Sequence, residues 1–106
     1  MTPIRIIVCG FGNVGRAFVR LIEDKQGDLK SRYGIAPQIH AVVDIGGAAV
    51  ADTHGLPLDQ LRGLMDSGLP IERMASFGRP GISGAAVLQT IPADVLVEAT
   101  PTNLVD

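Results

Sequence analysis

The chain has a single cysteine, no tryptophan and few aromatic residues of any kind. Cys9 has no partner for an internal disulfide, and no group of cysteines and histidines has the spacing of a zinc site. Aromatic residues make up 4% of the sequence, too few for a base-stacking surface, and nine basic residues against eleven acidic ones leave no positive field. We therefore expect neither a bound metal nor a nucleic-acid partner.

Long apolar runs are also lacking, and none approaches the roughly 18 residues that a membrane-spanning helix needs. Only four apolar residues separate Arg5 from Gly10, which is too short for a secretion signal. We therefore expect a cytoplasmic protein without a membrane partner. A chain of 106 residues, 46% of them hydrophobic, suffices for one domain over residues 1–106.

Three segments have the composition of buried β-strands. The first is apolar except for Arg5, as expected of a strand covered on both faces. Gly46-Gly47 interrupts the second segment, and residues 48–51 continue as a short extended piece. The strands are expected over residues 4–9, 39–45 and 95–97.

A helix is predicted directly after the first strand. Its apolar residues recur at i, i+3, i+4, i+7 and i+8, which predicts one buried face. Arg16 and Arg20 fall on the opposite, solvated side. We expect this helix to end before Gly27, and residues 26–37 to form a long connection. The residues of the expected buried face are Val14, Ala17, Phe18, Leu21 and Ile22.

Two shorter helices are expected further along the chain. One follows Pro57 and stops near Gly68, and the other is capped by Ser83 and ends at Thr90. Strands that alternate with helices predict an α/β fold, a Rossmann-type parallel sheet with right-handed crossovers and flanking helices. Only six residues follow Thr100, so we expect an incomplete sheet, the first half of a doubly wound domain.

An incomplete sheet lacks part of its cover. Residues 95–97 and Leu104-Val105 would then present an apolar patch or an unpaired strand edge. We therefore expect copies of the chain to self-associate through the uncovered sheet.

A glycine-rich turn between the first strand and the first helix fits the pattern G-x-G-x-x-G. In that pattern Gly10 allows the tight turn, Gly12 lets a pyrophosphate approach the backbone, and Gly15 lets the helix pack closely on the strand. The unpaired N–H groups of the helix start would face the anion. The alternative is a tight turn without a ligand. The candidate cofactor-binding residues are Gly10, Phe11, Gly12, Asn13, Val14 and Gly15.

An acidic residue, Asp44, stands at the end of the second strand, where it could accept hydrogen bonds from the adenosine ribose hydroxyls. It lies 29 residues after Gly15, a longer interval than the usual 20 or so, and the connection over residues 26–37 accounts for the excess. A carboxylate here disfavours a 2′-phosphate, so NAD is favoured over NADP. A solvated strand-end aspartate is the alternative.

The third candidate follows the last strand, at the carboxyl edge of the sheet where ligands of open α/β folds lie. Here Thr100, Pro101 and Thr102 could meet the nicotinamide end of a dinucleotide, or form an ordinary polar turn. Other candidates are weaker, and no residue qualifies as catalytic. Cys9 is expected in the core, and neither His40 nor His54 has a nucleophile or carboxylate at a recognisable spacing.

The chain resembles the N-terminal, cofactor-binding portion of homoserine dehydrogenases. The resemblance spans nearly all of the sequence except the loop of residues 67–84. It is carried by residues 6–16 (IIVCGFGNVGR), 42–48 (VVDIGGA), 55–58 (GLPL) and 94–103 (DVLVEATPTN). The glycine motif is common to many dehydrogenases, whereas the ordered combination is more specific.

The resemblance implies hydride transfer between homoserine and aspartate semialdehyde with NAD or NADP. It also implies that residues 10–15 hold the pyrophosphate, Asp44 the adenosine ribose, and Thr100 with Pro101 the nicotinamide end. The family's catalytic lysines, acidic substrate-binding residues and dimerising domain would lie downstream of residue 106. The small amino-acid-derived substrate would bind only to the full-length enzyme, and the fragment alone would be inactive.

Two other functions remain open at this point. One is a non-catalytic NAD-sensing regulatory domain, which also opens with a strand, a glycine turn and a helix. Such domains usually reach the second strand sooner, so the segment over residues 26–37 disfavours this alternative. The other is the cofactor domain of a different two-domain dehydrogenase.

Overall fold

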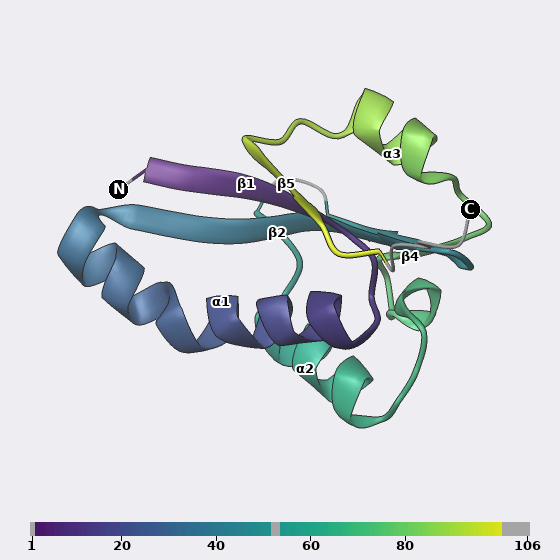
Figure 1. Ribbon diagram of the computed structural model, residues 1–106, viewed down its shortest axis with the longest axis horizontal. Helices are drawn as coiled ribbons and strands as arrows, with labels where there is room; N and C mark the ends of the chain where they lie inside the picture. The colour runs from purple at the N-terminus through teal and green to yellow at the C-terminus, as the bar shows by residue number, and fades with distance from the viewer. Residues whose placement is uncertain (1, 52–53, 101–106) are drawn as a thin grey trace, which may run out of the picture.

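The computed structural model describes residues 2–51 and 54–100, which form one five-stranded sheet flanked by helices (Figure 1). The strands lie in the order β4-β3-β2-β1-β5. The elements along the chain are β1 (Thr2–Cys9), α1 (Asn13–Tyr33), β2 (Ile35–Asp44), β3 (Gly47–Val50), α2 (Leu58–Asp66), the 3-10 turn η1 (Ile71–Arg73), β4 (Gly78–Pro80), α3 (Gly84–Thr90) and β5 (Val95–Glu98).

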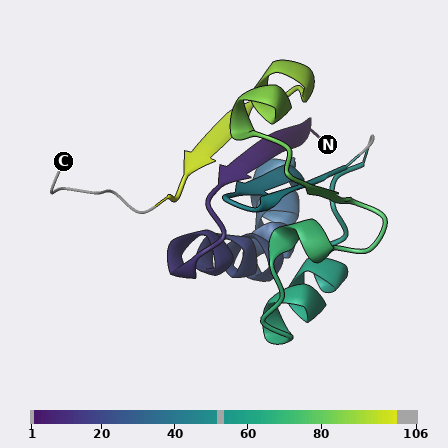
Figure 2. The ribbon, with the colours of Figure 1, turned by 90° about the vertical axis from the view of Figure 1, so that its right-hand side faces the viewer.

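The three strands expected from the sequence form the parallel part of the sheet. β1 lies in the middle, with Ile6 level with Ile39 of β2 and with Val95 of β5. Helices α1 and α2 cover one face of this sheet, and α3 lies on the other (Figure 2). Because successive residues of a strand face opposite sides, Ile6 and Val8 pack toward α1 and α2, whereas Ile7 packs toward α3. The α/β Rossmann-type class is therefore confirmed.

The sheet differs from the expected all-parallel arrangement at one side. β3 runs antiparallel to β2, and β4 antiparallel to β3. The reversal at β3 occurs because only Ile45 and Gly46 separate β2 from β3, and so short a connection can join only antiparallel neighbours. Gly47 has a φ of 147°, and a side chain there would meet the backbone of Arg79 in β4. The extended piece expected over residues 48–51 is thus part of a hairpin.

Helix α1 is longer than predicted, and the connection expected over residues 26–37 is wrong. The helix passes through Gly27 and ends at Gly34, whose φ of 66° is the left-handed conformation that stops helices. Gly34 also donates its backbone N–H to the carbonyls of Leu29 and Lys30. A glycine inside a helix costs only about 1 kcal/mol relative to alanine, so Gly27 weakens the helix without ending it.

The buried face of α1 is also offset from the predicted one. Gly15, Val19 and Ile22 are buried, whereas Val14 is 66% exposed and Leu21 51% exposed. Gly15 lies against the end of β1, and this close approach fixes the rotation of the helix. The positions that follow Gly15 at i+4 and i+7, Val19 and Ile22, then face the sheet; Ile22 belongs to the predicted set, whereas Val19 does not.

The two shorter helices agree with the sequence. α2 begins after Pro57 and buries Leu61, Leu64 and Met65. α3 begins after Ser83, whose hydroxyl oxygen accepts a hydrogen bond of 3.1 Å from the backbone N–H of Ala86. Among the described residues, no helix has the length and apolar character needed to cross a membrane.

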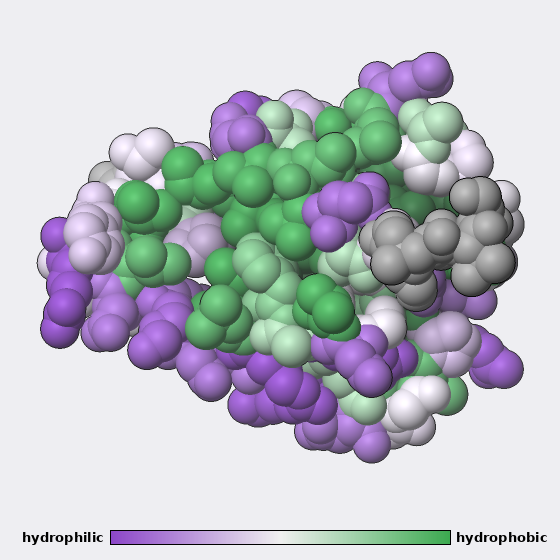
Figure 3. Space-filling view, viewed as in Figure 1, coloured by the Kyte–Doolittle hydropathy of each residue, from purple (hydrophilic) through white to green (hydrophobic). Residues whose placement is uncertain are grey.

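The last strand, β5, has the apolar composition of a buried strand but lies at an edge of the sheet, as the expected lack of cover over residues 95–97 predicts. It pairs with β1 on one side only. Val95 is 42% exposed and Leu96 51% exposed, because nothing in the described part of the chain covers them. Apolar residues gather on this side of the molecule, over β5 and the neighbouring part of β1 (Figure 3).

Candidate functional site

The turn between β1 and α1 lies at the carboxyl end of β1 and is closed tightly around Gly10. This residue has a φ of 108°, and a Cβ added to it would lie 2.6 Å from the carbonyl carbon of Ala99 and 2.8 Å from the nitrogen of Thr100. Its backbone N–H donates to the carbonyl of Val43 at the end of β2, at 2.7 Å. Only glycine fits where the ends of these three strands meet.

The other two glycines of the motif have opposite surroundings. A Cβ on Gly15 would overlap the carbonyl oxygen of Gly10, so the first turn of α1 rests directly on the end of β1. A Cβ on Gly12 would have no atom within 4 Å, and Gly12 itself is exposed. The turn therefore combines close packing at Gly10 and Gly15 with open space over the backbone at Gly12.

The first turn of α1 presents unpaired amides beside this open space. The first intrahelical hydrogen bond runs from the N–H of Arg16 to the carbonyl of Gly12, at 2.9 Å. The N–H groups of Asn13, Val14 and Gly15 precede it and have no partner within the helix. Gly12 supplies no side-chain cap, and the first turn holds no acidic residue. Both features favour an anion at this end of the helix dipole.

Arg16 has a role that the sequence did not reveal. Its guanidinium donates to the carbonyls of Phe11 at 2.9 Å and Leu69 at 3.2 Å, and lies 4.3 Å from the centre of the Phe11 ring. It also donates to the carbonyl of Met65 in the last turn of α2, at 3.4 Å. Arg16 is thus half-buried rather than fully solvated, and it ties the glycine turn to the end of α2. No sequence spacing signals such a contact.

Asp44 ends β2 and is half-buried. It directly follows Val43, whose carbonyl binds Gly10, so Asp44 and the glycine turn share one edge of the sheet. A second acidic side chain lies nearby, because a Cβ on Gly46 would come within 2.9 Å of the carboxyl carbon of Glu72. Sequence reasoning missed Glu72, which lies in the stretch with the weakest structural pattern.

Thr100 lies at the same edge, directly after β5. Its backbone N–H donates to Oε1 of Glu98 at 3.1 Å, and its hydroxyl donates to the same oxygen. These hydrogen bonds lower the pKa of the Glu98 carboxyl below its usual value. The N–H of Ala99 donates to the carbonyl of Cys9, which holds this segment beside the glycine turn. Pro101 and Thr102, the other predicted residues here, lie outside the described residues.

Of the remaining titratable candidates, Cys9 ends β1 beside this edge, whereas His40 and His54 lie elsewhere. Burial, and to a lesser degree Glu98, raises the pKa of the half-buried Cys9 thiol, which disfavours the reactive thiolate. His54 is exposed in the loop before α2. The described residues hold no cluster of three or more histidine, cysteine or acidic side chains that could bind a metal.

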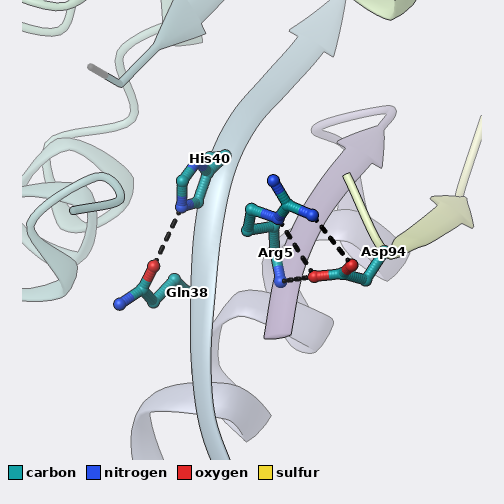
Figure 4. A network of polar contacts seen from close by, with 4 residues as sticks. All are labelled: Arg5, Gln38, His40 and Asp94. Carbon is teal, nitrogen blue, oxygen red and sulfur yellow. Dashed lines mark hydrogen bonds and ion pairs between the residues drawn. The ribbon is translucent and has the colours of Figure 1, made fainter. Parts of the chain in front are cut away.

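His40 is buried within β2 and belongs to a separate polar network (Figure 4). It is the extra residue of a bulge, since Ile6 pairs with Ile39 but Ile7 pairs with Ala41. Its Nε2 lies 2.9 Å from Oε1 of Gln38. Burial, followed by the charge of Arg5, lowers the pKa of the imidazole. The structure thus places His40 inside the sheet and not at the candidate site.

Two curated relatives match the chain in sequence. The NAD(+)-dependent homoserine dehydrogenase of Pseudomonas canavaninivorans is 33% identical over 110 residues, which cover 100% of this chain and 30% of that enzyme. The homoserine dehydrogenase of Methanocaldococcus jannaschii is 34% identical over 99 residues, which cover 93% of this chain and 29% of that enzyme. The chain therefore spans about 30% of the length of these relatives. No family model matches the chain.

Solved structures agree on the fold. A hyperthermophilic archaeal homoserine dehydrogenase in complex with NADPH matches with a TM-score of 0.74 at 20% identity, over 93% of this chain and 29% of that one. The homoserine dehydrogenase of Thermoplasma acidophilum matches with a TM-score of 0.66 at 26% identity, over 97% and 28% respectively. The resemblance noted in the sequence is thus confirmed, and the chain is related to homoserine dehydrogenases over its whole length. It corresponds to a Rossmann-type portion that makes up about 30% of the length of those enzymes.

Proposed function

We propose that this chain is the dinucleotide-binding portion of an NAD(P)-dependent homoserine dehydrogenase. The pyrophosphate binds over Gly12, against the unpaired amides at the start of α1. Asp44 binds the adenosine ribose, and Thr100, with Pro101 and Thr102, meets the nicotinamide end. The observation that carries the proposal is the contrast within the glycine motif, where Gly12 alone opens to solvent while its two companions are packed against backbone.

That contrast provides a direct test, the variant Gly12→Ala. Since an added Cβ has no atom within 4 Å, the free energy of unfolding should change by less than about 0.5 kcal/mol. The methyl group occupies the space of the pyrophosphate, so we expect affinity for NAD to fall at least tenfold. Titration followed by amide chemical shifts measures the affinity. The 106-residue chain itself should bind NAD with a dissociation constant in the micromolar to millimolar range, which corresponds to a binding free energy of about −8 to −4 kcal/mol.

Gly63→Ala is the matched control for Gly12→Ala, because an added Cβ on Gly63 in α2 is equally unobstructed. It should leave the affinity for NAD unchanged. Absence of chemical-shift changes around Gly12 at millimolar NAD, or equal weakening by the two variants, would contradict the proposed site.

Asp44 is proposed to favour NAD over NADP, because its carboxylate accepts hydrogen bonds from the ribose hydroxyls and repels a 2′-phosphate. The variant Asp44→Ser should weaken NAD binding about tenfold and narrow the preference between the two cofactors. Glu72→Gln is the control, since Glu72 supplies the other carboxylate beside the β2–β3 turn. If Glu72→Gln shifts the preference and Asp44→Ser does not, the assignment to Asp44 is wrong.

The complete enzyme is proposed to interconvert homoserine and aspartate semialdehyde. Among the described residues the candidate site holds groups that suit cofactor binding, namely backbone amides, a carboxylate and the hydroxyl of Thr100. We therefore expect the isolated chain to bind cofactor without oxidising homoserine. Turnover of homoserine and NAD by the purified chain, followed by absorbance of the reduced nicotinamide, would contradict this expectation.

A further inference from the structure

A hollow of about 440 Å³ lies between the second half of α1 and the first half of β2. Its volume is within the usual range of small-molecule sites, about 300–1,000 Å³. It is far from the glycine turn: Gly27 lines it, twelve residues along α1 from Gly15, and twelve helical residues span about 18 Å. The hollow is therefore separate from the proposed cofactor site.

The polar wall of this hollow includes one cationic side chain and several groups that can donate hydrogen bonds. Among the described residues its polar side chains are those of Gln26, Lys30, Gln38 and His54, and none of the described lining residues is acidic. The oxygen of the Gln38 amide is engaged by His40, so its nitrogen is turned away from that histidine, as Figure 4 shows. An ammonium group and an amide nitrogen can only donate. Such a wall favours an anionic ligand.

The rest of the lining is apolar. Pro37 and Ile39 of β2 and Leu56 and Leu58 on the other side contribute hydrocarbon surface. On α1 the wall includes Gly27, and a Cβ added there would have no atom within 4 Å. A ligand that fills this space needs a hydrocarbon body as well as a negative charge.

We propose that this hollow binds a small monocarboxylate with a short apolar body. The carboxylate pairs with Lys30 and accepts from Gln38 and His54, while the hydrocarbon part contacts the apolar wall. Inorganic phosphate would leave the apolar wall without a partner. A zwitterion would bring an ammonium group into a wall whose described residues include no carboxylate to receive it.

The test titrates the chain with 3-methylbutanoate and follows the backbone amide chemical shifts. We expect saturable shifts at Gln26, Gly27 and Lys30, with a dissociation constant in the millimolar range. The alcohol 3-methyl-1-butanol has the same hydrocarbon body without the charge and should bind at least tenfold more weakly. Inorganic phosphate, the charge without the body, should also bind at least tenfold more weakly.

Lys30→Gln should weaken 3-methylbutanoate about tenfold. Lys25→Gln is the matched control, because Lys25 is exposed on the same helix and does not line the hollow. The proposal is overturned if either control compound binds as tightly as the carboxylate, if both lysine variants weaken it equally, or if the shifts appear only at Gly12 and Asn13. Because NAD binding is measured separately at Gly12, the two proposals fail independently.

Discussion

Three glycines of one motif, at the scale of single residues, meet three different demands. Gly10 adopts a positive φ under the backbone of Ala99, Gly15 touches the carbonyl of Gly10, and Gly12 faces open space. A substitution at either packed position has to displace backbone, whereas one at Gly12 does not. This is why Gly12 is the position at which ligand binding can be separated from folding.

At the same scale, an ion pair between Arg5 and Asp94 joins β1 to the residue before β5. Nε and a terminal nitrogen of Arg5 donate to the two carboxylate oxygens of Asp94, each at 3.1 Å, and the backbone N–H of Arg5 adds a third hydrogen bond of 2.8 Å. These contacts lower the pKa of Asp94 from 3.8 to about 2. A carboxyl group whose pKa is lower in the folded state stabilises that state above its unfolded pKa.

We therefore predict that the contribution of Asp94 to stability is fully present above about pH 4 and is lost as the pH falls toward 2. The measurement is urea unfolding of the native chain and of Asp94→Asn over this range. The difference in unfolding free energy between the two should shrink on acidification. A difference that stays constant from pH 5 to 2 would contradict the ion pair, since the titration of other carboxyl groups is common to both proteins.

At the scale of elements, α1 shows how two glycines in one helix can act in opposite ways. Gly27 lies inside the helix with no positive φ, whereas Gly34 ends it at a φ of 66°. Neither position is crowded, because an added Cβ would find no atom within 4 Å at either one. Substitutions there report on backbone conformation alone.

We predict that Gly27→Ala raises the free energy of unfolding by about 0.5–1 kcal/mol, because alanine has the higher helix propensity. Gly34→Ala should lower it by about 1–2 kcal/mol, because a side chain disfavours the left-handed conformation. Thermal or urea unfolding of the two variants measures both effects. Opposite signs are the essential outcome; stabilisation by both substitutions would mean that α1 ends earlier than Gly34.

At the scale of the whole molecule, the sheet is covered unevenly. The face with α1 and α2 holds the larger buried cluster, and α3 alone covers part of the other face. Within the described residues β5 pairs only with β1, and its Val95 and Leu96 are exposed. An apolar strand with unpaired backbone groups is prone to pair with another chain.

We therefore predict that the chain self-associates through β5. Its weight-average mass in analytical ultracentrifugation should rise with concentration, and Leu96→Lys should return it toward the monomer because a charge on an edge strand opposes pairing. Tyr33→Lys is the control, since Tyr33 is 68% exposed on α1, away from this edge. A weight-average mass that stays at the monomer value up to high micromolar concentrations of the native protein would contradict the prediction.

The sequence by itself determined the order of the three parallel strands and the three α-helices, because apolar periodicity and turn residues act locally. The three parallel strands, the start of α2 after Pro57 and the Ser83 cap follow from it, and so does the position of the glycine turn between β1 and α1. Asp44 and Thr100 were likewise placed at strand ends, and parallel strands bring such ends to one edge.

Only the tertiary structure decided features that depend on contacts between distant segments. The inward face of α1 was set by the approach of Gly15 to Gly10, and the burial of Arg16 by carbonyls about 50 residues away at the end of α2. The pairing of β3 with β4 likewise joins Gly47 to Pro80, more than 30 residues further along the chain. Periodicity shows that a face is apolar, but the identity of the surface against it follows from the packed chain.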